Sequence, residues 1–267
     1  MSDAIDHPRA QPREHRYRLT TSDGVGIDAV LLRGAGSRTT AVILANGFTG
    51  THRNPSTRAV AEALLPFGDV MTFDFRGHHG SGGLSTVGNA EIHDLEAVAV
   101  RLRELGYTSL STVGFSMGAA VAIRHAAIYG GMDAVVSVSG PSRWYYRGTR
   151  AMRLLHLGIG RRAGRLFLRG FRKVRVVDKE WDPVPAEPRE IAGKVSPTPL
   201  LIVHGDSDAY FPVSHATAIH DAAREPRDLW IIPGMGHAER AVTPELSARV
   251  RDWLAEKVGG GNASAGG

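Results

Sequence analysis

Residues 113–118 read Val-Gly-Phe-Ser-Met-Gly and join two apolar stretches of different character. The run from Leu110 up to this point is continuous and apolar, which predicts a short buried strand, and the small residues after Gly118 predict a helix. A sharp turn from strand to helix strains the serine backbone, and a glycine on either side lets neighbouring chain pass close by. We therefore predict that Ser116 is a nucleophile at the end of its strand, above the positive end of the helix. The alternative is an ordinary turn, in which glycine and serine are common.

The composition narrows the possible classes of protein. A chain of 267 residues suits one large α/β domain, and the absence of cysteine excludes disulfides, thiolate metal sites and cysteine catalysis. The polar start of the chain lacks the apolar core of a secretion signal, and no run approaches the roughly 20 apolar residues of a membrane span. We expect a cytoplasmic protein without stable membrane insertion.

Apolar runs alternate with helical patterns along most of the chain, which predicts a mostly parallel sheet covered by helices, with an antiparallel start. The order breaks for about 55 residues after the sixth strand and then resumes. The predicted strands are 17–21, 27–32, 41–45, 70–75, 110–115, 134–138, 200–205 and 229–232, and the predicted helices besides that after Ser116 are 55–65, 90–105, 213–223 and 243–257.

This pattern predicts one domain with additions at both ends and one insertion. We expect a disordered leader at residues 1–13, a domain at 14–258, and a flexible glycine-rich tail at 259–267. The break after the sixth strand, residues 141–196, is predicted to be an inserted cap.

A serine hydroxyl needs a general base, and the base needs an orienting acid. In a parallel sheet such groups gather at the carboxyl ends of the strands. His237 closes the Gly-Met-Gly-His loop after the last predicted strand, and the loop after the preceding strand holds both Asp206 and Asp208. The chain order of serine, aspartate and histidine is the order expected of an α/β hydrolase, and either aspartate can supply the acid at this point.

With these motifs the sequence resembles the α/β-hydrolase-fold serine hydrolases, which include carboxylesterases, monoacylglycerol lipases and serine aminopeptidases. The resemblance covers roughly residues 15–258 apart from the cap. It implies the α/β-hydrolase fold, a mostly parallel eight-stranded sheet with a small cap after the sixth strand. The family's acid lies in a His-Gly-x-x-Asp loop, so the resemblance assigns that role to Asp208. It implies no metal and no cofactor.

The resemblance also points to two backbone donors for the oxyanion of acyl transfer. They are the N–H of Met117, which follows the serine, and that of Phe48. Relatives often carry His-Gly before the second donor, where this chain has Asn46-Gly47, and we expect Asn46 to be structural.

A second loop, residues 74–81, resembles the family's Asp-x-Arg-Gly-x-Gly-x-Ser motif with one extra histidine. We expect Asp74 and Arg76 to fix this loop. For His78 and His79 we expect neither a catalytic role nor a metal site, because no cluster of carboxylates is predicted beside them.

The positive charge of the chain is concentrated in one segment. Residues 141–195 hold 14 lysines and arginines against five acidic residues, whereas the net charge of the whole chain is +5. Nucleic-acid binding is not expected, since no known binding fold accompanies the charge. Arg161, Arg165, Arg169 and Arg172 fall on one helical stripe and Ala163, Leu166, Phe167 and Phe171 near another.

Two interpretations of these stripes remain open. In one, the apolar side of a lid faces the pocket and its arginines face water. In the other, the cap attracts an anionic partner: an acyl phosphopantetheine carrier, coenzyme A or an acidic membrane surface.

The functional prediction is a serine hydrolase that cleaves a small-molecule carboxylic ester through an acyl-enzyme intermediate. Alternatives are a thioesterase or an amide or peptide hydrolase acting on an anionic or carrier-bound acyl substrate, and a non-catalytic ligand-binding module on the same fold. Acyl chain length and oligomeric state are left undetermined by the sequence.

Overall fold

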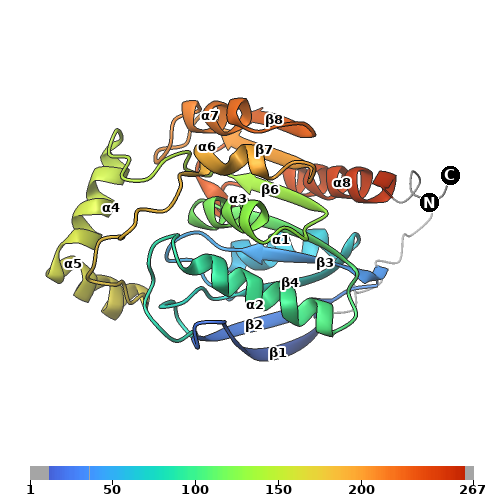
Figure 1. Cartoon of the computed structure of the whole chain (residues 1–267), viewed down its shortest axis with the longest axis horizontal. Helices are drawn as coiled ribbons and strands as arrows, with labels where there is room; N and C mark the ends of the chain where they lie inside the picture. The colour runs from blue at the N-terminus through green and yellow to red at the C-terminus, as the bar shows by residue number, and fades with distance from the viewer. Residues whose placement is uncertain (1–11, 36, 262–267) are drawn as a thin grey trace, which may run out of the picture.

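The fold is built on one sheet of eight strands (Figure 1). The computed structural model describes residues 12–35 and 37–261. The strand order is β1-β2-β4-β3-β5-β6-β7-β8, and β2 is antiparallel to both β1 and β4, whereas the other neighbouring pairs are parallel. This confirms the predicted sheet. The strands are β1 (Arg13–Thr20), β2 (Gly26–Arg33), β3 (Ser37–Ala45), β4 (Gly68–Phe73), β5 (Ser109–Phe115), β6 (Ala134–Val138), β7 (Leu200–Gly205) and β8 (Arg227–Ile232).

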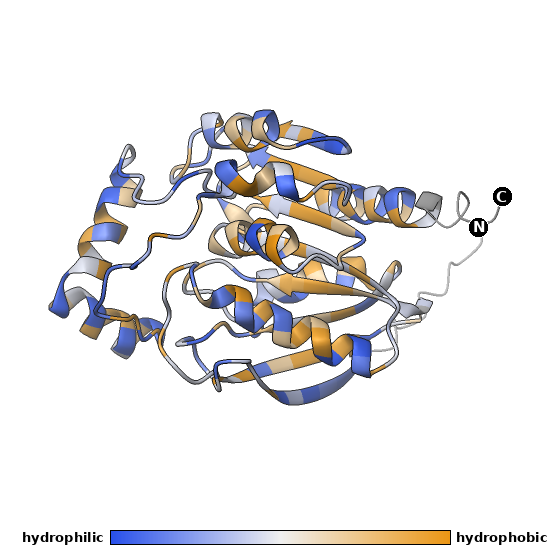
Figure 2. Cartoon of the chain, in the orientation of Figure 1, coloured by the Kyte–Doolittle hydropathy of each residue, from blue (hydrophilic) through white to orange (hydrophobic). Residues whose placement is uncertain are grey.

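Helices cover both faces of the sheet, as parallel strands require. Strands β4, β6 and β7 are buried at every position, and the strands in the middle of the sheet are largely orange in the hydropathy colouring of Figure 2. Two apolar layers hold the helices, with α2, α3 and α7 on one face and α1 and α8 on the other. These helices are α1 (Pro55–Leu64), α2 (Glu91–Glu104), α3 (Met117–Ile128), α7 (Ser214–Ala222) and α8 (Pro244–Gly261). Within the described residues, no helix combines the length and the apolar character needed to cross a membrane.

The ends of the domain differ slightly from the predicted bounds. Strand β1 begins at Arg13, the last residue of the predicted leader, and residues 1–11 of that leader lie outside the described residues. Helix α8 continues to Gly261, because an existing helix gains one hydrogen bond for each added residue even through glycines. The rest of the predicted tail, 262–267, also lies outside the described residues.

The inserted cap follows the sixth strand, as predicted, and its helices α4 and α5 stand at the left of Figure 1, beyond the sheet. It contains α4 (Arg150–Gly160), α5 (Arg162–Phe167) and a short π-helical turn, η1 (Leu168–Arg172). The predicted end of the cap at residue 196 is too late. Helix α6 (Pro188–Ile191) and the turn η2 (Ala192–Lys194) belong to the body of the domain, because Ile191, Ala192 and Val195 are buried in its core.

The orientation of α5 and η1 differs from the interpretation in which the apolar side of the lid faces the pocket and its arginines face water. Leu166, Phe167 and Phe171 are 60%, 55% and 78% exposed. Arg165 instead turns inward, where it pairs with Asp178 at 2.6 Å and donates to the last carbonyl groups of α4. The physical reason is that a guanidinium satisfies a carboxylate and the free carbonyls of a helix end together, which an apolar side chain cannot do.

Candidate active site

The site begins at the turn between β5 and α3. Ser116 has φ 51° and ψ −114°, a strained conformation for a residue with a side chain. A side chain at Gly114 would collide with the backbone of Gly118, and one at Gly118 would collide with the carbonyl of Ala45. The two glycines are therefore required by close approach of the chain, and the turn places Ser116 at the start of a twelve-residue helix.

His237 reaches the serine from the loop that follows β8. Its Nε2 lies 2.9 Å from Oγ of Ser116, and its Nδ1 lies 2.7 Å from Oδ2 of Asp208. In the tautomer that serves both contacts, the serine O–H donates to Nε2 and the Nδ1–H donates to the carboxylate. The ring of Tyr210 stacks on the imidazole with 4.3 Å between centroids, which restricts its rotation.

Asp208 is held as a carboxylate below the imidazole. Its side chain is fully buried, and burial alone would raise its pKa. The hydrogen bond from His237 and the backbone N–H groups of Tyr210 and Phe211, at 2.8 and 3.1 Å, outweigh burial, so the pKa of Asp208 is lowered. The carboxylate is thus charged at neutral pH and is directed at the Nδ1–H of the histidine.

The other candidate acid, Asp206, is exposed and has a different set of partners. Its Oδ1 accepts the backbone N–H of Gly234 at 2.7 Å and the hydroxyl of Ser207 at 3.0 Å. Asp206 therefore links the loop after β7 to the loop that carries His237. The structure brings Asp208, and not Asp206, to the imidazole.

The loop after β3 approaches the serine from the other side. Gly47 lies so close that a side chain there would stand 3.3 Å from Cβ of Ser116. In the described part of the chain, the N–H groups of Phe48 and Met117 donate to no protein acceptor. Asn46 is buried and donates to the carbonyl of Phe73 at 3.0 Å, which connects this loop to β4. This contact agrees with the structural role expected for Asn46.

His78 supports the same loop from below, a role that the sequence does not reveal. Its Nε2 accepts the backbone N–H of Thr49 at 3.2 Å, its Nδ1 contacts the carbonyl of Arg76 at 2.9 Å, and its ring meets Phe48 edge to face. Burial lowers the pKa of His78, so the imidazole is neutral and can accept that bond. The histidine touches the oxyanion loop and not Ser116.

Arg76 anchors the loop that contains His78. It is buried and bridges two carboxylates, Asp94 at 2.8 Å and Asp23 at 2.7 and 2.9 Å. The paired guanidinium lowers the pKa of Asp23, which keeps that carboxylate charged. The expected role of Arg76 in fixing this loop agrees with these contacts.

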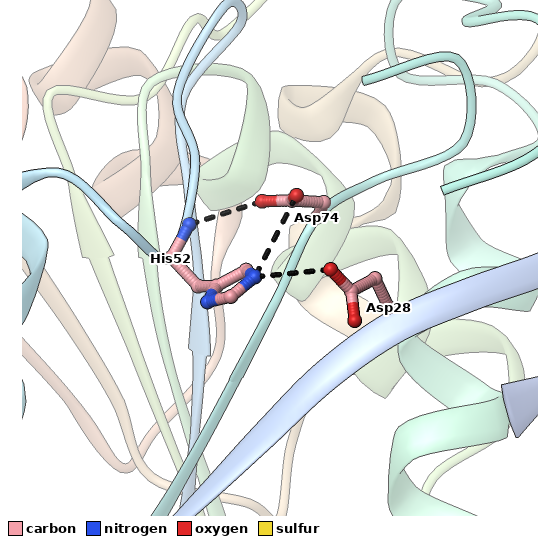
Figure 3. A group of neighbouring side chains, drawn as sticks. All are labelled: Asp28, His52 and Asp74. Carbon is pink, nitrogen blue, oxygen red and sulfur yellow. Dashed lines mark hydrogen bonds and ion pairs between the residues drawn. The ribbon is translucent and has the colours of Figure 1, made fainter. Parts of the chain in front are cut away.

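A histidine between two carboxylates lies beside this loop (Figure 3). Nε2 of His52 is 3.3 Å from Asp28 and 3.7 Å from Asp74, while the backbone N–H of His52 donates to Asp74 at 3.0 Å. These three side chains are the group in the described residues whose spacing would suit a metal ion. However, Arg53 already sits on the facing oxygen of Asp28 at 2.8 Å, and Gly80 donates to that of Asp74 at 3.2 Å. We interpret the cluster as a structural connection between β2 and the loops after β3 and β4.

A cavity of about 370 Å³ opens above Ser116 between the body and the cap. The body supplies Phe48 and Met117 to its wall, and α4 supplies Leu155 and Ile159. The lining is mainly apolar and aromatic, with a few charged side chains, Arg165 among them, at the cap. Such a cavity suits an apolar or aromatic group attached to a polar reacting centre.

The comparison with protein families agrees with this geometry. The model of the Alpha/beta hydrolase family matches residues 42–252, most of the chain. The chain belongs to the alpha/beta hydrolase family. A search of curated proteins finds no match to this α/β hydrolase.

Solved structures show the same fold. The esterase Pf2001 of Pyrococcus furiosus is 25% identical and superposes with a TM-score of 0.74, covering 92% of this chain and 93% of its own. The α/β hydrolase GrgF from Penicillium sp. sh18 is 18% identical, with a TM-score of 0.73 and coverage of 92% and 99%. Est1E from Butyrivibrio proteoclasticus, solved with bound ferulic acid, is 21% identical, with a TM-score of 0.67 and coverage of 91% and 100%.

Two features of this α/β hydrolase lie beyond what its sequence motifs indicate. The support of the oxyanion loop by His78 and the connection through His52 both depend on which loops meet at the carboxyl end of the sheet. For His78, the sequence offers the extra histidine within residues 74–81 as a signal, but it does not indicate which way the side chain points. For His52, the motifs offer no such signal.

Proposed function

We propose that this α/β hydrolase cleaves a carboxylic ester through an acyl-enzyme intermediate on Ser116. The observation that carries the proposal is the continuous line of hydrogen bonds from Ser116 through His237 to Asp208 at the floor of a mainly apolar cavity. A nucleophile, a base and an orienting acid in this geometry are the groups that acyl transfer needs.

The first half of the reaction follows from the positions of these atoms. Oγ of Ser116 attacks the carbonyl carbon while His237 Nε2 takes its proton, and the charge of Asp208 stabilises the imidazolium that forms. The oxyanion lies within reach of the free N–H groups of Phe48 and Met117. The imidazolium then gives its proton to the leaving alcohol, and the C–O bond breaks.

The second half repeats these steps with water. His237 takes a proton from a water molecule, which attacks the acyl carbon, and the same two N–H groups hold the oxyanion. The imidazolium returns the proton to Ser116, and the acid is released. Each proton has a donor and an acceptor among these groups, so the cycle balances without any further reagent.

The choice of an ester rests on family membership and on the neighbouring structures. The P. furiosus protein is described as an esterase, and it is similar to this chain over nearly the whole length of both. The mainly apolar cavity accommodates an acyl chain or an aromatic acid, and the leaving alcohol takes its proton from His237. Comparing kcat/KM for matched aryl esters, thioesters and amides tests this choice, and the ester is expected to give the highest value.

A fluorophosphonate probe tests the nucleophile directly. We expect one label per chain, on Ser116, and we expect Ser116→Ala to lose both the label and about 10⁶ of the esterase turnover, as removal of a serine nucleophile does in serine proteases. An exposed serine away from the site, such as Ser22, provides the control substitution. Labelling or turnover that survives Ser116→Ala would reject the mechanism, and a folded protein that binds acyl compounds without turnover would support a ligand-binding module.

A further inference from the structure

The outer side of the cap exposes large apolar side chains. On α4, Leu154 and Leu157 are 58% and 46% exposed, and on α5 and η1 the exposed residues are Leu166, Phe167 and Phe171. The rings of Phe167 and Phe171 stack on each other with 4.9 Å between centroids. We refer to these five residues as the outer cap surface. Monomeric proteins seldom expose groups of this kind without a binding role.

The pocket does not account for the outer cap surface. Helix α4 presents a second, inner set of side chains to the cavity, including Met152, Leu155 and Ile159. Helix α4 is therefore apolar on two sides, and only the inner side lines the cavity. The outer side needs a different partner.

The charge around this surface is of one sign. Residues 150–173 contain eight lysines and arginines and no acidic residue. Arg165 pairs with Asp178, but the other arginines between residues 150 and 172 are exposed and form no ion pair with any residue that the structure describes. These exposed arginines are Arg150, Arg153, Arg161, Arg162, Arg169 and Arg172.

We propose that the outer cap surface docks on a lipid bilayer that carries anionic head groups. Helices with leucine and phenylalanine beside arginine lie in such an interface, with the apolar side chains among the acyl chains and the guanidinium groups at the phosphates. Each basic residue close to an anionic bilayer strengthens binding about fivefold. The exposed arginines and the apolar side chains therefore act together on one kind of surface.

Two other occupants fit these observations less well. A second copy of the chain would bring two arginine-rich helices against each other, and like charges in contact oppose association. An acidic acyl carrier would complement the charge, but a polar protein surface would leave the stacked pair of phenylalanines without apolar contact. A bilayer satisfies both the charge and the apolar area.

Docking would place the substrate cavity next to the lipid, because α4 lines the cavity with one side and contributes to the outer cap surface with the other. The docking itself does not depend on the proposed hydrolysis.

Sedimentation with vesicles tests the proposal on the full chain. We expect tight binding to vesicles of phosphatidylcholine with 30% phosphatidylglycerol, at least 100-fold tighter than to phosphatidylcholine alone at 0.1 M salt. Binding should weaken strongly at 0.5 M salt, where the screening length is shorter. The Ser116→Ala protein should bind equally well, which separates docking from turnover.

Variants separate the apolar and charged contributions. Phe167→Ser with Phe171→Ser should reduce binding roughly tenfold or more, and Arg161, Arg169 and Arg172 changed to Gln should reduce it about 100-fold. Controls use exposed residues away from the cap: Ile128→Ser for the apolar change, and Arg13, Arg16 and Arg224 changed to Gln for the charge. Fluorophosphonate labelling and thermal unfolding verify that each variant is folded.

Three outcomes would overturn the proposal. The first is equal binding to neutral and anionic vesicles, or none to either. The second is a dimer in sedimentation velocity that the phenylalanine substitutions dissociate, which would assign the surface to a second copy. The third is loss of binding in the control variants equal to that in the cap variants, which would assign the effect to net charge alone.

Discussion

The elbow around Ser116 and the outer side of the cap place similar residues in opposite environments. In the loops around the elbow, two buried charged side chains have several partners each: Asp208 accepts three donors and Arg76 bridges two carboxylates. On the cap, phenylalanines and arginines lie in solvent, and Arg165 is the exception with an ion pair.

The difference lies in how many interactions within the chain each region makes. Buried charges are tolerated only when they are paired and hydrogen-bonded, so the elbow tolerates little change in any one partner. Exposed apolar and basic residues stabilise the fold little, and their presence on the cap is better explained by contact with something outside the chain. Substitutions at the elbow should therefore affect chemistry and stability, whereas those on the cap should affect association.

The largest effect in this comparison is expected at the acid of the site. Asp208→Asn should lower ester turnover by about 10⁴, because the histidine then loses its orienting carboxylate and adopts the wrong tautomer. Asp206→Asn is the matched control in the same loop and should lose less than roughly tenfold, since it only weakens a loop contact. Steady-state kinetics of the two purified variants measure the difference. A larger loss for Asp206→Asn would show that Asp206, and not Asp208, is the acid that orients His237.

The next effect concerns stability. Arg76→Met leaves two carboxylates without their buried cation and should lower the free energy of unfolding by about 3–5 kcal/mol. Arg161→Met makes the same chemical change on the exposed cap and should alter it by less than about 0.5 kcal/mol. Urea unfolding of both variants measures the two values, and similar losses would contradict the contrast between the elbow and the cap.

A smaller, pH-dependent effect is expected where the cap leaves the body. His215 is buried, and its Nδ1 accepts the backbone N–H of Ser142 at 2.9 Å, so burial, assisted by the charge of Arg143, lowers its pKa to about 4. The unfolded chain binds a proton near pH 6.5 and the folded chain does not. Stability is therefore complete above pH 6.5 and falls as the pH drops towards 4, by about 3 kcal/mol in total.

Unfolding in urea at pH 7.5 and pH 4.5 measures this linkage. His215→Asn keeps an acceptor without a titrating ring, so it should remove most of the pH dependence that this residue contributes. His15→Asn, on exposed strand β1, should leave the dependence as it is in the unmodified protein. An unchanged pH slope in the His215 variant would show that its imidazole is not neutral in the folded protein.

The sequence by itself determined the sheet and the identity of the residues at its carboxyl end. The alternation of apolar runs and helical patterns is a local property, and it was sufficient to predict the eight strands and the break after the sixth. The glycines around Ser116 predicted a turn with close backbone approach. In the structure, a side chain at Gly114 or at Gly118 would collide with neighbouring backbone. The order of Ser116, the aspartates and His237 followed from the same pattern, because loops after parallel strands share one edge.

Only the tertiary structure decided which side chains meet and which way the cap helices face. Residue chemistry left Asp206 and Asp208 equivalent until the resemblance was considered. The structure separates them, because the carboxylate of Asp208 meets His237 Nδ1 whereas that of Asp206 accepts the N–H of Gly234. The helical period predicted an arginine stripe and an apolar stripe on α5 and η1, but Arg165 alone of the arginines turns inward, because periodicity carries no information about which side chain finds a partner. Arg165 turned inward because Asp178 and the end of α4 lie there, whereas Phe167 and Phe171 were left outside.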